Sequence, residues 1–291
     1  MDDNKLYNAL LKSQDERRQQ SQRQGEAKPE DNFRTERPFA GSDRVRPNWV
    51  KVDVEHSDHP PTVYDSSISL ELIGNPQPWS RDQLRERKII YPGMPDKAVM
   101  DAYRELRIQL RNRAGEKNFA VMFSSLGNRG NSVLTAFNLA ASFAMDSHTS
   151  ALLVDCDPYN QDLSKLVSVE MEAGVTDYVA DKSLSIRDIL YPSGVARLSV
   201  IPAGTQVSSA VELFSSVRMR DLVSELKSRY PDRCIVLNVP PFQETTEARI
   251  LERFADQIVF GVPFGDVTAD VIAESVEALG SHKFSGVVFQ E

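Results

Sequence analysis

The chain has 291 residues, an apolar content of 41% and a formal net charge of −8. This length suits one large domain with an appendage, or two small domains. The acidic balance argues against nucleic acid and anionic lipid as main partners, because both are bound chiefly through Lys and Arg. No stretch approaches the roughly 20 apolar residues of a membrane span, and no signal-peptide core follows Met1. We therefore expect a cytoplasmic protein without direct membrane insertion.

Residues 1–95 differ in composition from the rest of the chain. They hold nine of the sixteen prolines, and residues 14–46 are almost wholly polar. Such a stretch cannot bury enough apolar surface to offset the entropy lost on ordering it. We expect a largely disordered arm with a short helix at Leu6–Leu11. Two segments with alternating apolar and polar residues, Trp49–Val54 and more weakly Ser67–Leu72, are expected to dock on the folded domain or on a partner.

From residue 96 to residue 291, strand and helix signals alternate. Apolar runs of strand length occur at residues 119–123, 151–154, 198–201, 234–237, 258–262 and 286–289. Helical patterns occur at residues 98–112, 132–145, 219–228, 247–254 and 266–279. This alternation predicts an α/β domain, with a mostly parallel sheet covered by helices on both faces. The two cysteines, Cys156 and Cys234, lie in apolar surroundings and are expected to be reduced and buried.

The first predicted strand is followed by a glycine-bearing turn and then by a helix. This is the context of a phosphate-binding loop, G-x-x-x-x-G-K-[ST], in which backbone N–H groups hold phosphate oxygens and the lysine neutralises the terminal phosphates. The candidate binding residues are Gly127, Arg129, Gly130, Asn131 and Ser132. Because asparagine or serine occupies the place of the lysine, we interpret this segment as a degenerate phosphate loop of P-loop NTPase type.

Polar residues also follow the second and fourth predicted strands. Asp155 and Asp157 form a D-x-D pair, which at the carboxyl end of a parallel strand suits Mg²⁺ coordination beside a phosphate. The same pair would equally serve to begin a turn before Pro158, and the spacing leaves both alternatives open. The fourth strand runs into Asn238, where a P-loop protein normally has an acidic residue for the metal. An amide is a much poorer partner for a hard dication.

The helical pattern at residues 98–112 carries charged residues at spacings of three and four. They are Asp101, Arg104, Arg107 and Arg111. This spacing places them on one polar face of the helix. A charge stripe of this kind is typical of a solvated face with weak ion pairs.

In their order and spacing, these motifs resemble the bacterial tyrosine autokinases (BY-kinases) of capsule and exopolysaccharide loci, relatives of the MinD and ParA ATPases. The resemblance covers about residues 95–290. The matching motifs are Asp101-x-x-Arg104-x-x-Arg107, Asn138-Leu139-Ala140, Asp155-x-Asp157, Ile201-Pro202-Ala203-Gly204, Glu212-Leu213-Phe214 and Asn238-Val239-Pro240-Pro241. Residues 246–259 are similar to the branch found with exosortase-linked polysaccharide systems. The resemblance implies ring assembly through the helix with Asp101, and bound ATP or ADP with Mg²⁺ at the two aspartates.

Three parts of an autokinase are altered together in this chain. The loop lysine is missing, Asn238 replaces an aspartate, and no tyrosine cluster follows the last tyrosine, Tyr230. Removing one group that stabilises developing charge typically costs about two to three orders of magnitude in rate. We therefore expect no efficient catalysis; Asp155 and Asp157 would act only if some activity remains.

The leading hypothesis is a catalytically impaired or inactive kinase-like protein that regulates or scaffolds polysaccharide polymerisation and export. Its partner would be the cytoplasmic segment of a membrane co-polymerase or a kinase paralogue, which would recruit it to the inner face of the membrane as a homo- or hetero-oligomer. The alternative is an unconventional ATP-binding kinase or ATPase, in which Arg129 supplies the missing positive charge. A MinD-like positioning protein fits less well, because no basic amphipathic tail follows Phe289.

Overall fold

The structure is a computed structural model in which residues 77–115, 118–127, 132–146, 149–229, 233–280 and 282–290 are described. The helix expected at Leu6–Leu11 and the docking segments expected at residues 49–54 and 67–72 lie outside these residues, as does Tyr230. Within the described ranges, no helix has the length and apolar character that crossing a membrane requires.

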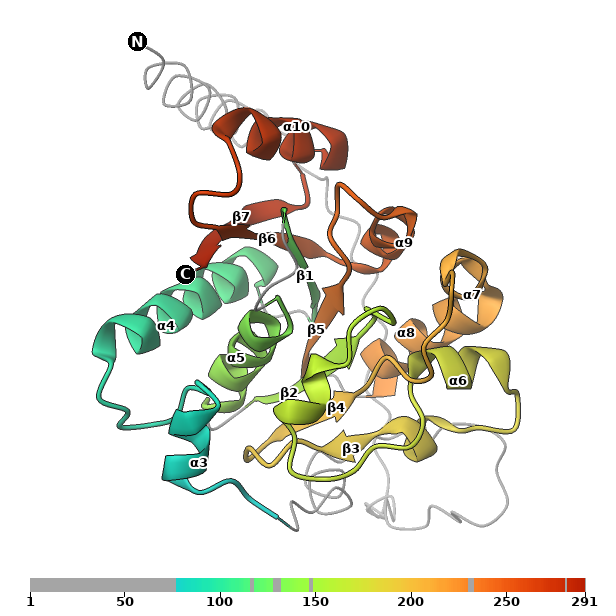
Figure 1. Cartoon of the computed structure of the whole chain (residues 1–291), viewed down its shortest axis with the longest axis horizontal. Helices are drawn as coiled ribbons and strands as arrows, with labels where there is room; N and C mark the ends of the chain where they lie inside the picture. The colour runs from blue at the N-terminus through green and yellow to red at the C-terminus, as the bar shows by residue number, and fades with distance from the viewer. Residues whose placement is uncertain are drawn as a thin grey trace, which may run out of the picture. The chain divides into compact units, whose positions relative to one another are not determined.

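The described residues form a seven-stranded sheet in the order β3-β4-β2-β5-β1-β6-β7 (Figure 1). The strands are β1 (Ala120–Ser125), β2 (Ser150–Asp155), β3 (Tyr191–Pro192), β4 (Leu198–Ile201), β5 (Arg233–Val239), β6 (Gln257–Pro263) and β7 (Phe284–Gln290). Every neighbouring pair is parallel except β3 and β4. The mostly parallel α/β sheet predicted from the alternating pattern is therefore confirmed.

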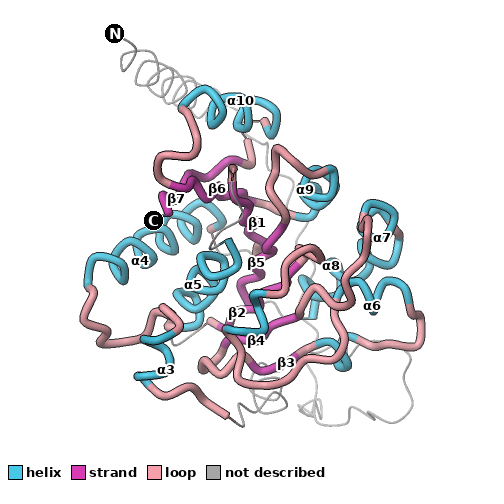
Figure 2. Tube along the Cα trace, viewed as in Figure 1, coloured by secondary structure: helices cyan, strands magenta, loops and turns pink. Residues whose placement is uncertain are grey.

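Helices cover both faces of this sheet, as the cyan and magenta segments of Figure 2 show. They are α3 (Arg81–Glu86), α4 (Lys97–Ala114), α5 (Ser132–Ala144), α6 (Val175–Ala180), α7 (Val211–Ser215), α8 (Val217–Arg229), α9 (Thr246–Leu251) and α10 (Ala269–Leu279). Helices α4 and α5 contribute to one hydrophobic cluster, and α6 to α10 contribute to the other. Four short elements, α3, α6, α7 and β3, were absent from the sequence-based expectation.

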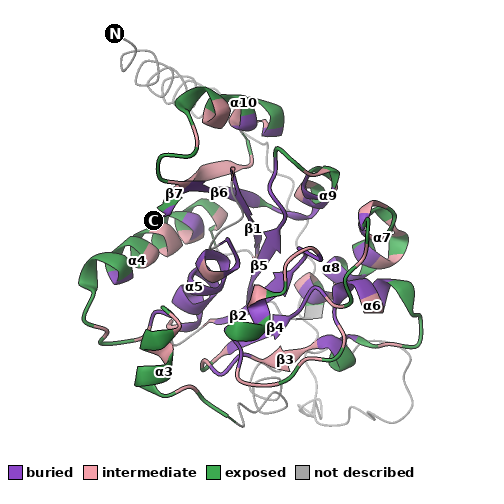
Figure 3. Ribbon diagram, viewed as in Figure 1, coloured by how far each residue is buried: buried purple, intermediate pink, exposed green. Residues whose placement is uncertain are grey.

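The alternation of side chains along each strand divides the core into these two clusters. In β1, Ala120 and Met122 join the cluster under α6 to α10, whereas Val121 and Phe123 join the cluster under α4 and α5. Successive side chains of a strand point to opposite faces of its sheet, which explains this division. The central strands and α5 are buried along most of their length (Figure 3).

Residues ahead of position 96 also pack on the domain. Ile90 donates its backbone N–H to Oδ1 of Asn138 in α5 at 3.0 Å, and Nε1 of Trp79 donates to the Leu166 carbonyl at 3.0 Å. Ile89 and Ile90 are both buried. The segment from Trp79 to Ile90 therefore joins the packed fold, although its composition had grouped it with the N-terminal arm.

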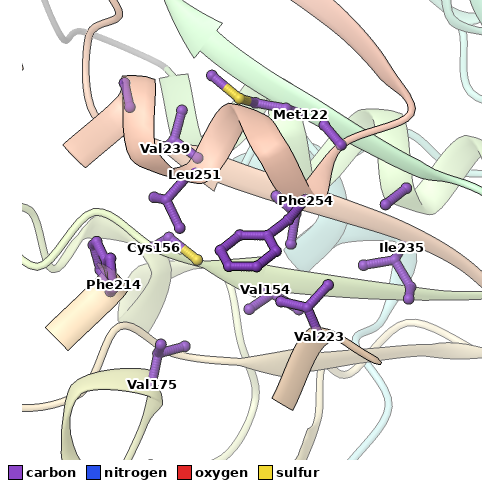
Figure 4. Close-up of a cluster of buried hydrophobic side chains, with 14 of the residues drawn as sticks. Met122, Val154, Cys156, Val175, Phe214, Val223, Ile235, Val239, Leu251 and Phe254 are labelled. Carbon is purple, nitrogen blue, oxygen red and sulfur yellow. The ribbon is translucent and has the colours of Figure 1, made fainter. Parts of the chain in front are cut away.

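Both cysteines are unpaired and buried, as expected. Cys156 follows β2 and faces the cluster that includes Val154, Leu251 and Phe254 (Figure 4). Burial raises the pKa of the Cys156 thiol well above its ordinary value, so this thiol stays protonated. Because side chains alternate along the chain here, Asp155 projects toward the α5 face of the sheet.

Candidate functional site

The candidate site lies at the carboxyl ends of β2 and β5, beside the start of α5. Asp155 at the end of β2 is paired in register with Asn238 in β5. Ser132 is the first residue of α5, and all three side chains are buried. Parallel strands end at the same edge of a sheet, so the register brings together polar residues far apart in the sequence.

A chain of hydrogen bonds joins these three residues. The Ser132 hydroxyl donates to Oδ1 of Asn238 at 3.2 Å, and Nδ2 of Asn238 donates to Oδ1 of Asp155 at 2.8 Å. Oδ1 of Asp155 also accepts from the Asp157 backbone N–H, whereas the Ser132 hydroxyl can both donate and accept. The NH₂ group of Asn238 therefore faces Asp155 and its carbonyl faces Ser132.

Asp155 and Asp157 also make the turn that was one of the two alternatives left open. Oδ1 of Asp155 accepts from the Asp157 backbone N–H at 3.1 Å, and Oδ1 of Asp157 accepts from the Tyr159 backbone N–H at 3.1 Å. Bonds of this pattern are typical of Asx turns. Burial raises the pKa of Asp155 to about 7, and the bonds from Asn238 and Asp157 only partly oppose this effect.

In the arrangement observed, Asn238 presents no oxygen to a metal beside Asp155, and Mg²⁺ binding by Asp155 and Asp157 stays a prediction. A magnesium ion requires oxygen ligands in near-octahedral geometry, but Asn238 turns its NH₂ group toward Asp155 and its carbonyl toward Ser132. Among the described residues, no group of three or more His, Cys, Asp and Glu side chains is placed to hold a metal ion. In this arrangement, the side-chain amide of Asn238 is the hydrogen-bond partner of the buried Asp155 carboxyl group.

The phosphate-loop position is described at its two ends. Gly127 follows β1 with a φ of 79°, and a Cβ there would lie 2.9 Å from Cγ2 of Val267. Glycine suits this position because it adopts positive φ without a steric penalty. Ser132 begins α5 at the other end. The predicted binding residues Arg129, Gly130 and Asn131 lie outside the described residues, so their role stays a prediction.

A second polar contact near the site was not expected from the sequence. The Tyr159 hydroxyl donates to Oε1 of Glu247, which also accepts from the Ala210 backbone N–H at 3.4 Å. Glu247 is buried, and the contact ties the loop after β2 to the starts of α9 and α7. Helix α9 begins just after Thr245, whose hydroxyl donates to the Pro241 carbonyl at 2.9 Å and makes no capping bond to the helix.

The charged stripe on α4 consists of one ion pair and two arginines that contact other parts of the domain. Arg104 forms an exposed ion pair with Asp101 at 3.1 Å. In contrast, Arg107 donates to the Ser142 carbonyl of α5 at 2.7 Å, and the guanidinium of Arg111 lies over the ring of Phe119. The ion pair of Asp101 and Arg104 is exposed, whereas Arg107 and Arg111 are half-buried.

The fold is that of a P-loop NTPase-like α/β domain. Among proteins of known sequence, the chain is 26% identical over 170 residues to tyrosine-protein kinase Wzc of Salmonella typhi, a match that covers 58% of this chain and 23% of Wzc. It is 23% identical over 182 residues to tyrosine-protein kinase CpsD of Streptococcus agalactiae, covering 61% of this chain and 77% of CpsD. No family model matches the chain.

Solved structures give the same result for the fold. The kinase domain of the Escherichia coli tyrosine kinase ETK matches with a TM-score of 0.61 at 23% identity, covering 74% of this chain and 88% of that domain. The VpsO kinase domain matches with a TM-score of 0.58 at 23% identity, covering 67% and 97%. These matches confirm the resemblance to bacterial tyrosine kinases that the sequence motifs indicate. The matched part of the chain spans only about a quarter of the length of Wzc.

Proposed function

We propose that this protein is a catalytically impaired relative of the tyrosine autokinases and acts as a regulatory or scaffold subunit of capsule or exopolysaccharide biosynthesis. The observation that carries the proposal is the hydrogen bond from Asn238 to Asp155. In phosphoryl transfer, the protein contributes mainly positioning and stabilisation of charge, which the metal and its carboxylate ligands supply. In this chain an amide occupies the position between the strand ends where those ligands would face a metal.

The protonation of Asp155 supports the same proposal. Its pKa of about 7 keeps a substantial fraction of the carboxyl neutral at physiological pH. A protonated carboxyl is a poor metal ligand, since metal binding requires the deprotonated form. This property, together with the missing loop lysine, opposes efficient turnover of ATP.

The partner and the mode of assembly belong to the same proposal. The cytoplasmic segment of a membrane polysaccharide co-polymerase or a kinase paralogue would recruit the protein to the inner face of the membrane. Helix α4 would contact a neighbouring subunit through Asp101, Arg104 and Arg107, of which Asp101 and Arg104 form an exposed ion pair. This pair is accessible without any change in the packing of the domain.

Nucleotide titration and autophosphorylation assays test the proposal. The purified full chain, with and without Mg²⁺, is compared with the ETK kinase domain under identical conditions. We expect no phosphate transfer above background and weak or absent binding of ATP. Turnover at the rate of the active kinase, abolished by Asp155→Ala, would overturn the proposal.

The positive φ of Gly127 favours one alternative, in which the loop still binds phosphate. In that case Arg129 would provide the charge that the lysine provides elsewhere. Calorimetric titration of Arg129→Ala with ATP tests this alternative, and Arg187→Ala is the matched control, because Arg187 is an exposed arginine on a short helical turn away from the loop. Micromolar binding that is lost in Arg129→Ala and kept in Arg187→Ala would favour an unconventional ATPase.

A further inference from the structure

A pocket of about 390 Å³ opens beside the candidate site, and none of the functions considered above uses it. It lies between the loop that follows β2 and the loop that follows β4. Asp155 contributes to its wall, and the remaining walls come from residues 160, 161, 163, 164, 171–173 and 202–206. The pocket therefore extends from the polar site toward the carboxyl end of β4.

One wall of the pocket is held rigidly by backbone contacts. The Pro202 carbonyl accepts from the Val175 N–H, and the Ala203 carbonyl accepts from the Thr176 N–H, both at 2.9 Å. Gly174 approaches so closely that a Cβ on it would lie 2.2 Å from the Pro202 oxygen. The Ile201-Pro202-Ala203-Gly204 motif noted in the sequence thus forms a preorganised wall, clamped to the start of α6.

Among the described residues that line the pocket, the ionisable side chains are acidic. Its lining includes the carboxyl group of Asp155 and the carboxylate of Glu172, and no Lys or Arg is among the described residues that line it. Oδ1 of Asp155 accepts two hydrogen bonds, but Oδ2 accepts none from the residues that the structure describes. Asp155 is only 2% exposed, so this free oxygen belongs to a buried carboxyl at the pocket wall. Such a lining disfavours phosphates and other anions.

Apolar side chains lie beside these acceptors. Leu163, Met171 and Ala173 contribute to the same pocket. An aliphatic stem that ends in a cationic head would contact both kinds of surface, as lysine and arginine side chains commonly do. The guanidinium of arginine adds five N–H donors in a planar arrangement that suits carboxylates.

We propose that this pocket binds a lysine or arginine side chain presented by a partner protein. The chemistry of the pocket is independent of the proposed function, but the source of the partner rests on it. Cytoplasmic segments next to membrane spans are rich in Lys and Arg, and the net charge of −8 on this chain favours encounter with such segments. The cytoplasmic segment of a membrane protein is therefore the partner that the pocket fits.

The test uses a blocked tripeptide, acetyl-Gly-Arg-Gly-amide, titrated into the full-length protein and followed by NMR. Its counterpart with citrulline in place of arginine has nearly the same shape and no charge. We expect the arginine peptide to shift the backbone amide signals of Gly204 and Thr205, and to bind at least about tenfold more tightly than the citrulline peptide. Glu172→Gln should weaken the arginine peptide several-fold.

Glu170→Gln is the matched control, because Glu170 is an exposed carboxylate two residues away that does not line the pocket. Equal binding of the citrulline peptide would overturn the proposal in favour of a neutral polar ligand such as a sugar. Equal losses in Glu170→Gln and Glu172→Gln would overturn it in favour of general surface attraction. Absence of shifts at Gly204 would also overturn it. Rapid ATP turnover would instead overturn the proposed function and leave peptide binding unaffected.

Discussion

Asn238 donates a hydrogen bond of 2.8 Å to Asp155 across the neighbouring ends of β5 and β2. The bond gives a buried carboxyl group a neutral partner inside the protein. A buried carboxyl without such a partner would carry a large desolvation penalty or remain protonated. Side chains of the site itself therefore satisfy part of the hydrogen-bonding capacity of Asp155. The first two predictions follow from this pairing.

Asn238→Asp is expected to destabilise the protein and to create a response to Mg²⁺. A second carboxyl group beside Asp155 replaces a donor with a like charge, which we expect to cost about 1–3 kcal/mol in the free energy of unfolding. Thermal unfolding with and without millimolar Mg²⁺ measures both effects. The midpoint of the variant should rise with Mg²⁺, whereas that of the wild type should not.

The control for this change is Asn160→Asp, in the loop after β2. Oδ1 of Asn160 accepts from the Asp162 N–H at 2.8 Å, and an aspartate can accept the same bond. We expect little loss of stability there. If Asn238→Asp is as stable as the wild type and indifferent to Mg²⁺, the account of this pair is wrong.

The stability of the protein should depend on pH through Asp155. The folded-state pKa of about 7 lies above the ordinary value of 3.8, so between these values the unfolded chain releases a proton that the folded protein keeps. The free energy of unfolding therefore falls as pH rises through this window and levels off above it. The Asp155→Asn variant has no titrating group at this position, so its free energy of unfolding should not fall in this way as pH rises.

Urea unfolding at about pH 5 and about pH 8 measures the difference between Asp155→Asn and the wild type. We expect the variant to gain roughly 2 to 3 kcal/mol relative to the wild type over this range. Comparing the two proteins at each pH removes the contribution of the other titrating groups. A constant difference would mean that Asp155 has an ordinary pKa.

Gly204→Ala should be much more harmful than Gly93→Ala. Both glycines have positive φ, 92° and 82°, so an alanine is strained at either position. A Cβ at Gly204 would also lie 2.4 Å from Oδ2 of Asp177, whereas a Cβ at Gly93 would meet nothing within 4 Å. We expect an additional loss of about 1–3 kcal/mol at Gly204, measured by urea unfolding. Equal losses of stability in the two variants would show that the loop after β4 can shift to accommodate the added Cβ at little cost in free energy.

Tyr159→Phe should destabilise the domain by about 1–3 kcal/mol, because it removes a hydrogen bond to the buried Glu247 carboxylate. Tyr91→Phe is the control, since no hydrogen bond of the Tyr91 hydroxyl is found within the described part of the chain. Chemical denaturation of the two variants gives the comparison. Similar stabilities of the two variants would show that the hydrogen bond between Tyr159 and Glu247 makes no net contribution to the free energy of unfolding.

Arg104 and Arg107 should respond differently to truncation. Arg107→Ala removes a hydrogen bond to the Ser142 carbonyl and should lower stability by about 1 kcal/mol or more. Arg104→Ala breaks only an exposed ion pair and should change stability by less than about 1 kcal/mol. If α4 mediates assembly, sedimentation velocity should show weaker association for Arg104→Ala without unfolding. Unchanged association would remove α4 from the proposed interface.

Local patterns predicted most of the regular structure. The strands around Val121, Leu153 and Val236 and the long helices α4 and α5 agree with the predicted ranges to within about two residues at most ends. The helix α3 and the short strand β3 were missed because they carry too few apolar residues to show a period. Ile89 and Ile90 are buried by contacts with α5, which no local pattern reveals.

The sequence by itself determined the order of strands and helices, the absence of a lysine at the phosphate-loop position and the replacement of an aspartate by Asn238, because these are properties of residues and their spacing. Only the tertiary structure decided that the Asn238 amide faces Asp155, that Glu247 accepts from Tyr159 and that Arg107 turns toward α5. These contacts join residues that are distant along the chain. They depend on strand register and helix packing, in which a small shift would exchange one partner for another.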